Sequence, residues 1–200
     1  MNVIRPALAF LAALAATPAT ASLAEVSAAL KAATSFTAEF TQIAASGASE
    51  HGRVTLARPG RVRFQYDHAS ILVVADGHAL NLIDYKVSQV SSWPIRGTPL
   101  AVLLDPDLDL SRFAHVTQED ARGIEIEAAD ARHPEYGVTT LDFARDATAP
   151  GGLRIAGWRV KDAQGNTTRV SLADVRFNVP VDAALFRFRD PRPKKIPGRG

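Results

Sequence analysis

The fold is decided by residues 52–66, whose sequence is GRVTLARPGRVRFQY. Two runs of two-residue alternation flank Pro59 and Gly60, and such alternation is typical of half-buried β-strands. Proline followed by glycine favours a type II turn. The stretch therefore predicts a β-hairpin with strands over Gly52–Ala57 and Val62–Tyr66.

One face of this predicted hairpin is apolar and the other is polar. The even-numbered apolar positions are Val54, Leu56, Val62, Phe64 and Tyr66, and the odd-numbered polar positions are Arg53, Arg61, Arg63 and Gln65. Arg58 has even parity, which places it at the rim of an apolar concavity, where its five donors need acceptors such as the carbonyls that end a short helix. The alternative is that the turn frees Arg58 into solvent, because parity often fails at the end of a hairpin.

Similar alternation recurs on both sides of this hairpin. Phe36, Ala38 and Phe40 share one face of a strand that starts at Ser35, and Asp76-Gly77 favours a two-residue hairpin turn. Further strands are predicted over Ile71–Ala75, Leu80–Asp84, Gln89–Ser92, Phe113–Thr117, Ile124–Ala128, Val138–Phe143, Leu153–Asp162 and Thr167–Phe177. So many short strands at even spacing predict an α+β, mainly β fold built on an antiparallel sheet that is strongly curved or partly closed.

Two helices interrupt the strand pattern. Ser22 followed by Glu25 forms a potential capping box, and the apolar residues that follow it recur at helical spacing as far as Ala33. Thr98 and Pro99 favour the start of a short second helix, which Pro106 ends. This second helix is apolar all round, with Leu100, Val102, Leu103 and Leu104, so it is either a plug in the core or a lid over a ligand cavity.

The two ends of the chain differ from the body. Residues 1–21 combine an early Arg5, a short apolar run and Ala19-x-Ala21, a pattern that predicts a secretory signal cleaved after Ala21. Residues 187–200 hold six basic residues, against which only Asp190 is acidic, and three prolines. This tail is either a solvated extended segment or a segment attracted to anionic lipid headgroups.

Composition excludes several classes of function. The chain has no cysteine, so disulfides, thiolate metal sites and thiol nucleophiles are ruled out. Between the predicted signal and the tail, acidic residues outnumber basic ones, which argues against nucleic-acid binding. No pair of the five histidines has metal-ligand spacing, and no catalytic motif is present. We therefore expect no enzyme activity, no metal and no cofactor.

Several motifs, taken in order, resemble the family of periplasmic outer-membrane lipoprotein carrier proteins, the LolA family. The matching residues are Phe36-x-Ala38-x-Phe40-x-Gln42, Gly52-x-Val54 leading to Arg58-Pro59, Phe64, Ile71-Leu72-Val73-x-x-Asp76-Gly77, Thr98-Pro99-Leu100, and Asp182-x-x-x-Phe186-x-Phe188 followed by Pro191. The resemblance implies an incomplete antiparallel barrel over residues 22–190, closed by a lid of short helices, with residues 191–200 as a basic tail.

The resemblance also implies a function. A periplasmic carrier of this family takes acylated lipoproteins from an inner-membrane ATP-driven releasing complex and passes them to an outer-membrane acceptor lipoprotein or to the membrane surface. The expected acyl-binding cavity and lid comprise Val54, Leu56, Phe64, Tyr66, Leu100, Val102, Leu103 and Leu104. Arg58 is expected to lock the lid of a monomeric protein, and Val62 stands where the family commonly places an aromatic residue near the contact with the donor.

Two other functions remain open. A periplasmic sensor or regulatory module can recognise lipidated proteins through the same half-barrel, although its usual second domain is absent from a chain this short. A lipid hydrolase is the more distant alternative, because it needs a nucleophile and a base for which the sequence offers no motif.

Overall fold

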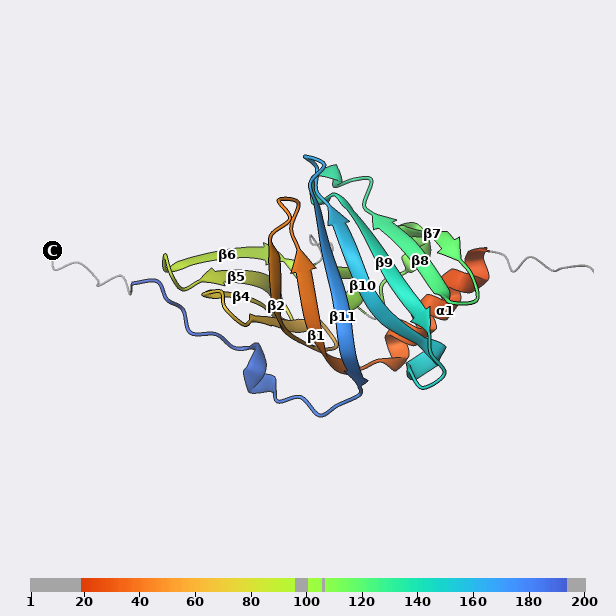
Figure 1. Ribbon diagram of the computed structural model, residues 1–200, viewed down its shortest axis with the longest axis horizontal. Coiled ribbons are helices and arrows are strands. Elements are labelled where there is room, and N and C mark those ends of the chain that lie inside the picture. Colours follow the sequence, from red (N-terminus) through yellow and green to blue (C-terminus); the bar gives the residue numbers. More distant parts are fainter. Residues whose placement is uncertain (1–18, 96–100, 106, 194–200) are drawn as a thin grey trace, which may run out of the picture.

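The computed structural model describes residues 19–95, 101–105 and 107–193. Among these, eleven strands form one antiparallel sheet in the order β6-β5-β4-β3-β2-β1-β11-β10-β9-β8-β7, so β6 and β7 are its two edges (Figure 1). The strands are β1 (Ser35–Ile43), β2 (Ser49–Ala57), β3 (Arg61–Tyr66), β4 (Ile71–Asp76), β5 (Ala79–Asp84), β6 (Gln89–Pro94), β7 (Ala114–Glu119), β8 (Gly123–Ala129), β9 (Val138–Arg145), β10 (Leu153–Lys161) and β11 (Thr167–Phe177). The predicted mainly β class and curved antiparallel sheet are confirmed.

In the part of the chain that the structure describes, the helices are few and short. They are α1 (Ala19–Ala32), α2 (Ala101–Leu104) and the 3-10 turns η2 (Leu110–Arg112), η3 (Pro134–Tyr136), η4 (Pro150–Gly152) and η5 (Ala183–Phe186). Side chains of α1 and α2 pack on one face of the sheet, which we call the inner face, and the opposite face is the outer face. Within the described residues, no helix is long and apolar enough to cross a membrane.

The hairpin over residues 49–66 follows the predicted alternation. Val54 and Leu56 of β2 are each 1% exposed on the inner face, whereas Arg53 and Gln65 are exposed on the outer face. Gly52 is required because a Cβ there would lie 2.1 Å from the backbone oxygen of Gln65. Gly60 has a φ of 70°, which suits the positive-φ position of the predicted turn.

Three local predictions need correction. The first helix begins at Ala19 rather than at Ser22, so Ser22 lies inside α1 and its hydroxyl donates to Glu119 instead of capping the helix. The hairpin turn after β4 is Gly77-His78, because Asp76 still belongs to β4 and its carboxylate accepts the amides of His78 and Ala79. The region expected as the tail starts with ordered packing, since Phe188 contacts a second apolar cluster.

This second cluster lies on the outer face. It joins the outward residues of β2, β4 and β5 to the segment that follows β11, and its buried members are Ala57, Leu72, Val74, Ile83 and Phe186. We call residues 178–188 the C-terminal strap. Arg63 donates from the outer face to the carbonyls of Leu185 and Arg187, so apolar and polar contacts together hold the strap on the sheet. The last tail residues, 194–200, and the predicted signal residues 1–18 lie outside the described residues.

Candidate functional site: an apolar inner face closed by two helices

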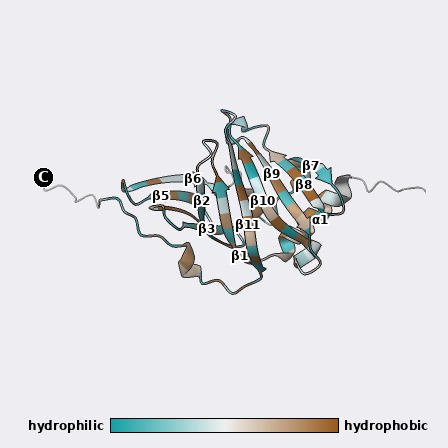
Figure 2. Cartoon of the chain, viewed as in Figure 1, coloured by the Kyte–Doolittle hydropathy of each residue, from teal (hydrophilic) through white to brown (hydrophobic). Residues whose placement is uncertain are grey.

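The inner face is lined by the apolar residues that the alternation selected. Val54, Leu56 and Phe64 are 1%, 1% and 6% exposed, and Tyr66 is half-buried beside them. All four belong to or pack against the main core cluster, which also contains residues of α1 and α2. The hydropathy colouring of Figure 2 shows apolar bands repeating across neighbouring strands.

An aromatic row crosses this face. Phe40 of β1 contacts Phe64 and Tyr66 edge to face at ring-centroid distances of 5.5 and 5.1 Å, and Phe64 contacts Trp158 of β10 at 6.0 Å. The Tyr66 hydroxyl donates to Gln42 at 3.0 Å, and burial raises the pKa of this phenol. The row therefore joins the two halves of the sheet through a continuous aromatic surface.

Side chains of the helices fill the inner face. The cavity beside Arg58, lined by residues of α1, β10 and α2, measures only about 10 Å³. A larger cavity of about 440 Å³ opens at the rim, between Val102 and the ends of β8 and β9. Since protein interiors are close-packed, a long apolar ligand can reach the inner face only if a covering element moves.

Helix α2 covers part of the inner face and makes apolar contacts on several of its sides. Val102, Leu103 and Leu104 are 7%, 3% and 1% exposed. Leu100, which we also expected in the lid, lies outside the described residues, as do Thr98, Pro99 and Pro106. Beyond its apolar packing, α2 accepts two hydrogen bonds from the hairpin turn, one from Arg58 and one from the amide of Gly60 to Leu104 at 3.0 Å.

The Arg58 guanidinium points inward and bridges the two helices. Its Nε donates to the carbonyl of Leu103 at 3.0 Å, and its Nη1 donates to the carbonyl of Ala33, which follows the last residue of α1. Both carbonyls stand at helix C-terminal ends, where backbone oxygens lack intrahelical partners. Burial lowers the pKa of Arg58 to about 10, so the group stays protonated at neutral pH. No carboxylate pairs with it among the described residues, and the bridge is held by neutral acceptors alone.

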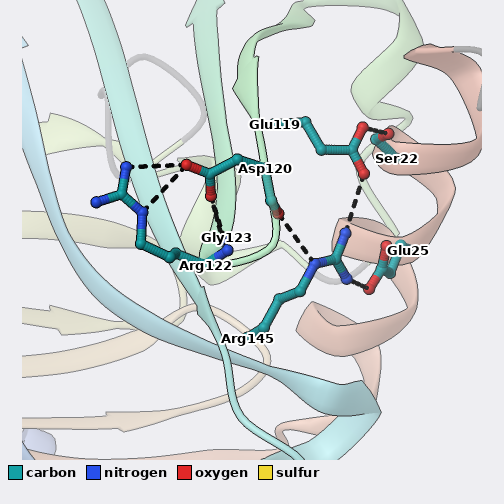
Figure 3. Close-up of polar contacts among 7 residues, drawn as sticks. All are labelled: Ser22, Glu25, Glu119, Asp120, Arg122, Gly123 and Arg145. Atoms are coloured by element: carbon teal, nitrogen blue, oxygen red, sulfur yellow. Dashed lines mark hydrogen bonds and ion pairs between the residues drawn. The ribbon is translucent and has the colours of Figure 1, made fainter. Parts of the chain in front are cut away.

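Helix α1 is also held by a polar network at its first turns (Figure 3). Arg145 of β9 donates to Glu25 at 2.6 Å and to Glu119 at 3.0 Å, and Ser22 donates to the same Glu119. Ser22 is only 2% exposed, so this contact is shielded from water. The network fixes α1 to the β7 edge of the sheet, whereas among the described residues α2 is held by hydrogen bonds without an ion pair.

We expect Arg145→Met to lower the free energy of unfolding by about 1 kcal/mol, because Glu25 and Glu119 lose their shared cation. Hydrogen exchange should rise in α1 more than in the centre of the sheet. Arg122→Met is the matched control, since Arg122 pairs with Asp120 nearby but its side chain is 87% exposed (Figure 3). Equal destabilisation by the two substitutions would contradict an anchoring role for Arg145.

Two further residues of β3, Val62 and Arg61, lie on opposite faces of the sheet. Val62 is 2% exposed and packs in the main core, and its expected place near the contact with the donor stays a prediction. Arg61 points outward as its parity predicts, and its guanidinium lies 5.5 Å from the ring centroid of Phe186. The predicted acceptor at the end of a short helix is confirmed in the Leu103 carbonyl of α2, whereas sequence reasoning missed Ala33 as the second acceptor, Trp158 and the Arg145 network. Within the described residues, no group of metal-binding side chains is present.

A curved open sheet with an apolar inner face, closed by helices, defines a half-barrel class of protein. The family described as outer membrane lipoprotein carrier protein LolA matches residues 31–189, and the chain belongs to this family. The resemblance that the sequence motifs indicated is thereby confirmed.

Two relatives carry the name of this family, and a solved structure shares the fold. An outer-membrane lipoprotein carrier protein of Bordetella avium is 29% identical over 148 residues, which cover 72% of this chain and 68% of the relative. A protein of the same name from Chromobacterium violaceum is 26% identical over 188 residues, 88% of each chain. A DUF1329 family protein of Desulfovibrio piger has a TM-score of 0.53 at 10% identity, covering 86% of this chain and 98% of that chain, and shows the fold alone.

Proposed function

We propose that this protein is a periplasmic carrier that binds the acyl chains of lipoproteins against its inner face. It takes its cargo from an inner-membrane ATP-driven releasing complex and delivers it to an outer-membrane acceptor lipoprotein or to the membrane surface. Family membership and the names of the relatives support this proposal. The observation that carries it is the Arg58 bridge, which holds two helices over an otherwise apolar face.

In this proposal α2 is the lid. Helix α1 is tied to β7 and β9 by the Arg145 network, whereas α2 depends on two hydrogen bonds and on apolar contacts that acyl chains can replace. Opening therefore moves Val102, Leu103 and Leu104, together with Leu100, and exposes Val54, Leu56, Phe64 and Tyr66 to the cargo. The protein performs no covalent chemistry and uses no cofactor.

The lock explains how such a carrier can also release its cargo. Each buried methylene contributes about 0.8 kcal/mol, so several acyl chains would bind almost irreversibly to a permanently open face. Re-forming the Arg58 bridge favours the closed, empty state and opposes that affinity. The same proposal includes secretion by a signal over residues 1–21, a carrier domain over residues 22–190 and a monomeric state.

We expect the purified protein to release a radiolabelled, triacylated lipoprotein from spheroplasts as a soluble complex. Added outer membranes should then receive the label from that complex. The reason is that the apolar inner face replaces the membrane as the environment of the acyl chains.

The matched control is the same lipoprotein with its lipidated cysteine replaced by serine, which should not form a complex. Capture of both forms would contradict recognition through acyl chains. Capture of the acylated form without onward transfer would instead support the sensor function.

A further inference from the structure

The turn between α1 and β1, residues 32–35, receives contacts from both faces of the sheet. From the inner side, Arg58 donates through Nη1 to the carbonyl of Ala33, and the backbone amide of Arg58 donates to the carbonyl of Thr34 at 2.8 Å. Ala33 has only a methyl side chain, and its carbonyl lies beyond the last helical residue. The direction of the Ala33 carbonyl is therefore set by the backbone positions of its neighbours, Ala32 and Thr34.

Asn178, the first residue of the C-terminal strap, holds those neighbouring residues. Its Oδ1 accepts the amide of Thr34 at 2.9 Å and the Thr34 hydroxyl at 3.0 Å, and its Nδ2 donates to the carbonyl of Ala32 at 3.2 Å. The Asn178 amide also donates to the carbonyl of Ser35 at 2.8 Å. One side chain thus fixes the residues immediately before and after Ala33.

The backbone at this position favours asparagine. Asn178 has a φ of 53°, in the left-handed region that asparagine tolerates better than most residues other than glycine. Farther along the strap, the carbonyl of Val179 accepts the Ser35 hydroxyl at 2.7 Å, and Phe186 is buried in the outer-face cluster. Asn178 therefore connects the strap on the outer face to the acceptor of Arg58 on the inner face.

We propose that Asn178 is a positioning residue of the lid lock. It aims the Ala33 carbonyl at the Arg58 guanidinium, and so the outer-face strap helps to set how often α2 opens. This inference rests on the proposed role of Arg58 as the lock, and it adds a residue that touches neither α2 nor the inner face in any contact described above.

The test compares hydrogen exchange of α2 with that of β9 and β10 in the full-length mature protein. Asn178→Gly keeps the positive φ and removes the side chain. We expect it to raise exchange of the α2 amides about three- to tenfold, as loss of one hydrogen bond would, while exchange in β9 and β10 changes much less. Asn178→Asp retains the acceptor for Thr34 and should give an intermediate increase.

The decisive comparison uses the Arg58→Leu background. If Asn178 acts through Arg58, Asn178→Gly should not raise α2 exchange further in this background, because no guanidinium remains to donate to the Ala33 carbonyl. Asn166→Gly is the matched control, since Asn166 also bonds through its side chain in an exposed turn, at 2.9 Å to Asp162, far from the lid in sequence.

The outcomes separate the two proposals. Unchanged α2 exchange in Arg58→Leu would overturn both the lock and the role of Asn178. If Arg58→Leu raises α2 exchange, three results would overturn the role of Asn178 alone. These are no effect of Asn178→Gly, additive effects in the double variant, and an equal rise of hydrogen exchange throughout the sheet. A selective, non-additive rise in α2 supports it.

Discussion

Arg58→Leu should bind acylated lipoprotein normally but transfer it to outer membranes about ten- to a hundredfold less readily. The wild-type guanidinium donates to Leu103 in α2 and to Ala33 after α1, and a leucine can make neither bond. A charged hydrogen bond contributes about 1.5–3 kcal/mol, which corresponds to that range of affinity. The closed state loses this advantage, and loaded protein should accumulate.

Transfer is measured as the passage of labelled lipoprotein from the soluble complex to added membranes, and hydrogen exchange over α2 reports the lid directly. Arg58→Lys should lie between wild type and Arg58→Leu, because an ammonium keeps the charge but lacks the planar fork that reaches both carbonyls. Since the pKa of Arg58 is lowered only to about 10, its charge and therefore the lock should not vary around neutral pH.

The control for Arg58→Leu is Arg53→Leu, which removes an exposed guanidinium from the outer face of the same strand, β2. Arg61→Leu is unsuitable because Arg61 lies over the Phe186 ring and its loss would disturb the strap. Transfer at the wild-type rate by Arg58→Leu would contradict the lock. An equal defect in Arg53→Leu would show that the effect does not depend on the bridge.

Local alternation predicted the hairpin correctly but failed where a strand is irregular. The positions of Val54, Leu56 and Phe64 follow from parity because β2 and β3 pair without a register shift. Strand β10 has a shift between Ile155 and Gly157, which changes parity along the strand. Trp158 is therefore buried on the same face as Leu153 and Ile155, although simple alternation would place it outside.

The particular residues that form contacts between distant segments could not be predicted from sequence patterns. Parity offered the inward position of Arg58 as one of two alternatives and a short helix end as the kind of acceptor, but it did not identify the two acceptors, which are 25 and 45 residues away in the chain. For the same reason Ser22 was assigned to a local cap, when its partner is Glu119, 97 residues away. Spacing rules capture neighbours on one element, whereas these bonds depend on how the whole sheet curves.

The sequence of β4 contains a pattern that predicts the outer-face cluster only in part. Residues 71–75, ILVVA, are apolar without interruption, and a strand buried on both faces has such a pattern. Leu72 and Val74 do face the outer cluster, while Val73 and Ala75 face the main core. The segment that covers them was not predicted, because it meets the outer face only through contacts between distant parts of the chain, such as that between Arg63 and Leu185, 122 residues apart.

Phe186→Ala should lower the free energy of unfolding by about 3 kcal/mol, the cost of truncating a buried aromatic side chain. The ring is 3% exposed, packs against the outer-face cluster and lies under the Arg61 guanidinium. Its removal leaves a cavity over β4 and deprives the strap of its main apolar contact. Denaturant unfolding measures the loss, and hydrogen exchange should show that the strap is released first.

Leu185→Ala provides the control for this effect, because Leu185 is the adjacent residue on the same turn but its side chain is 44% exposed. A truncation at the surface should change stability by less than about 0.5 kcal/mol. If Phe186→Ala cost no more than Leu185→Ala, the strap would be a loosely attached tail. A large difference between the two makes the strap part of the folded domain, with its outer-face packing contributing to the stability of the sheet that carries Arg58.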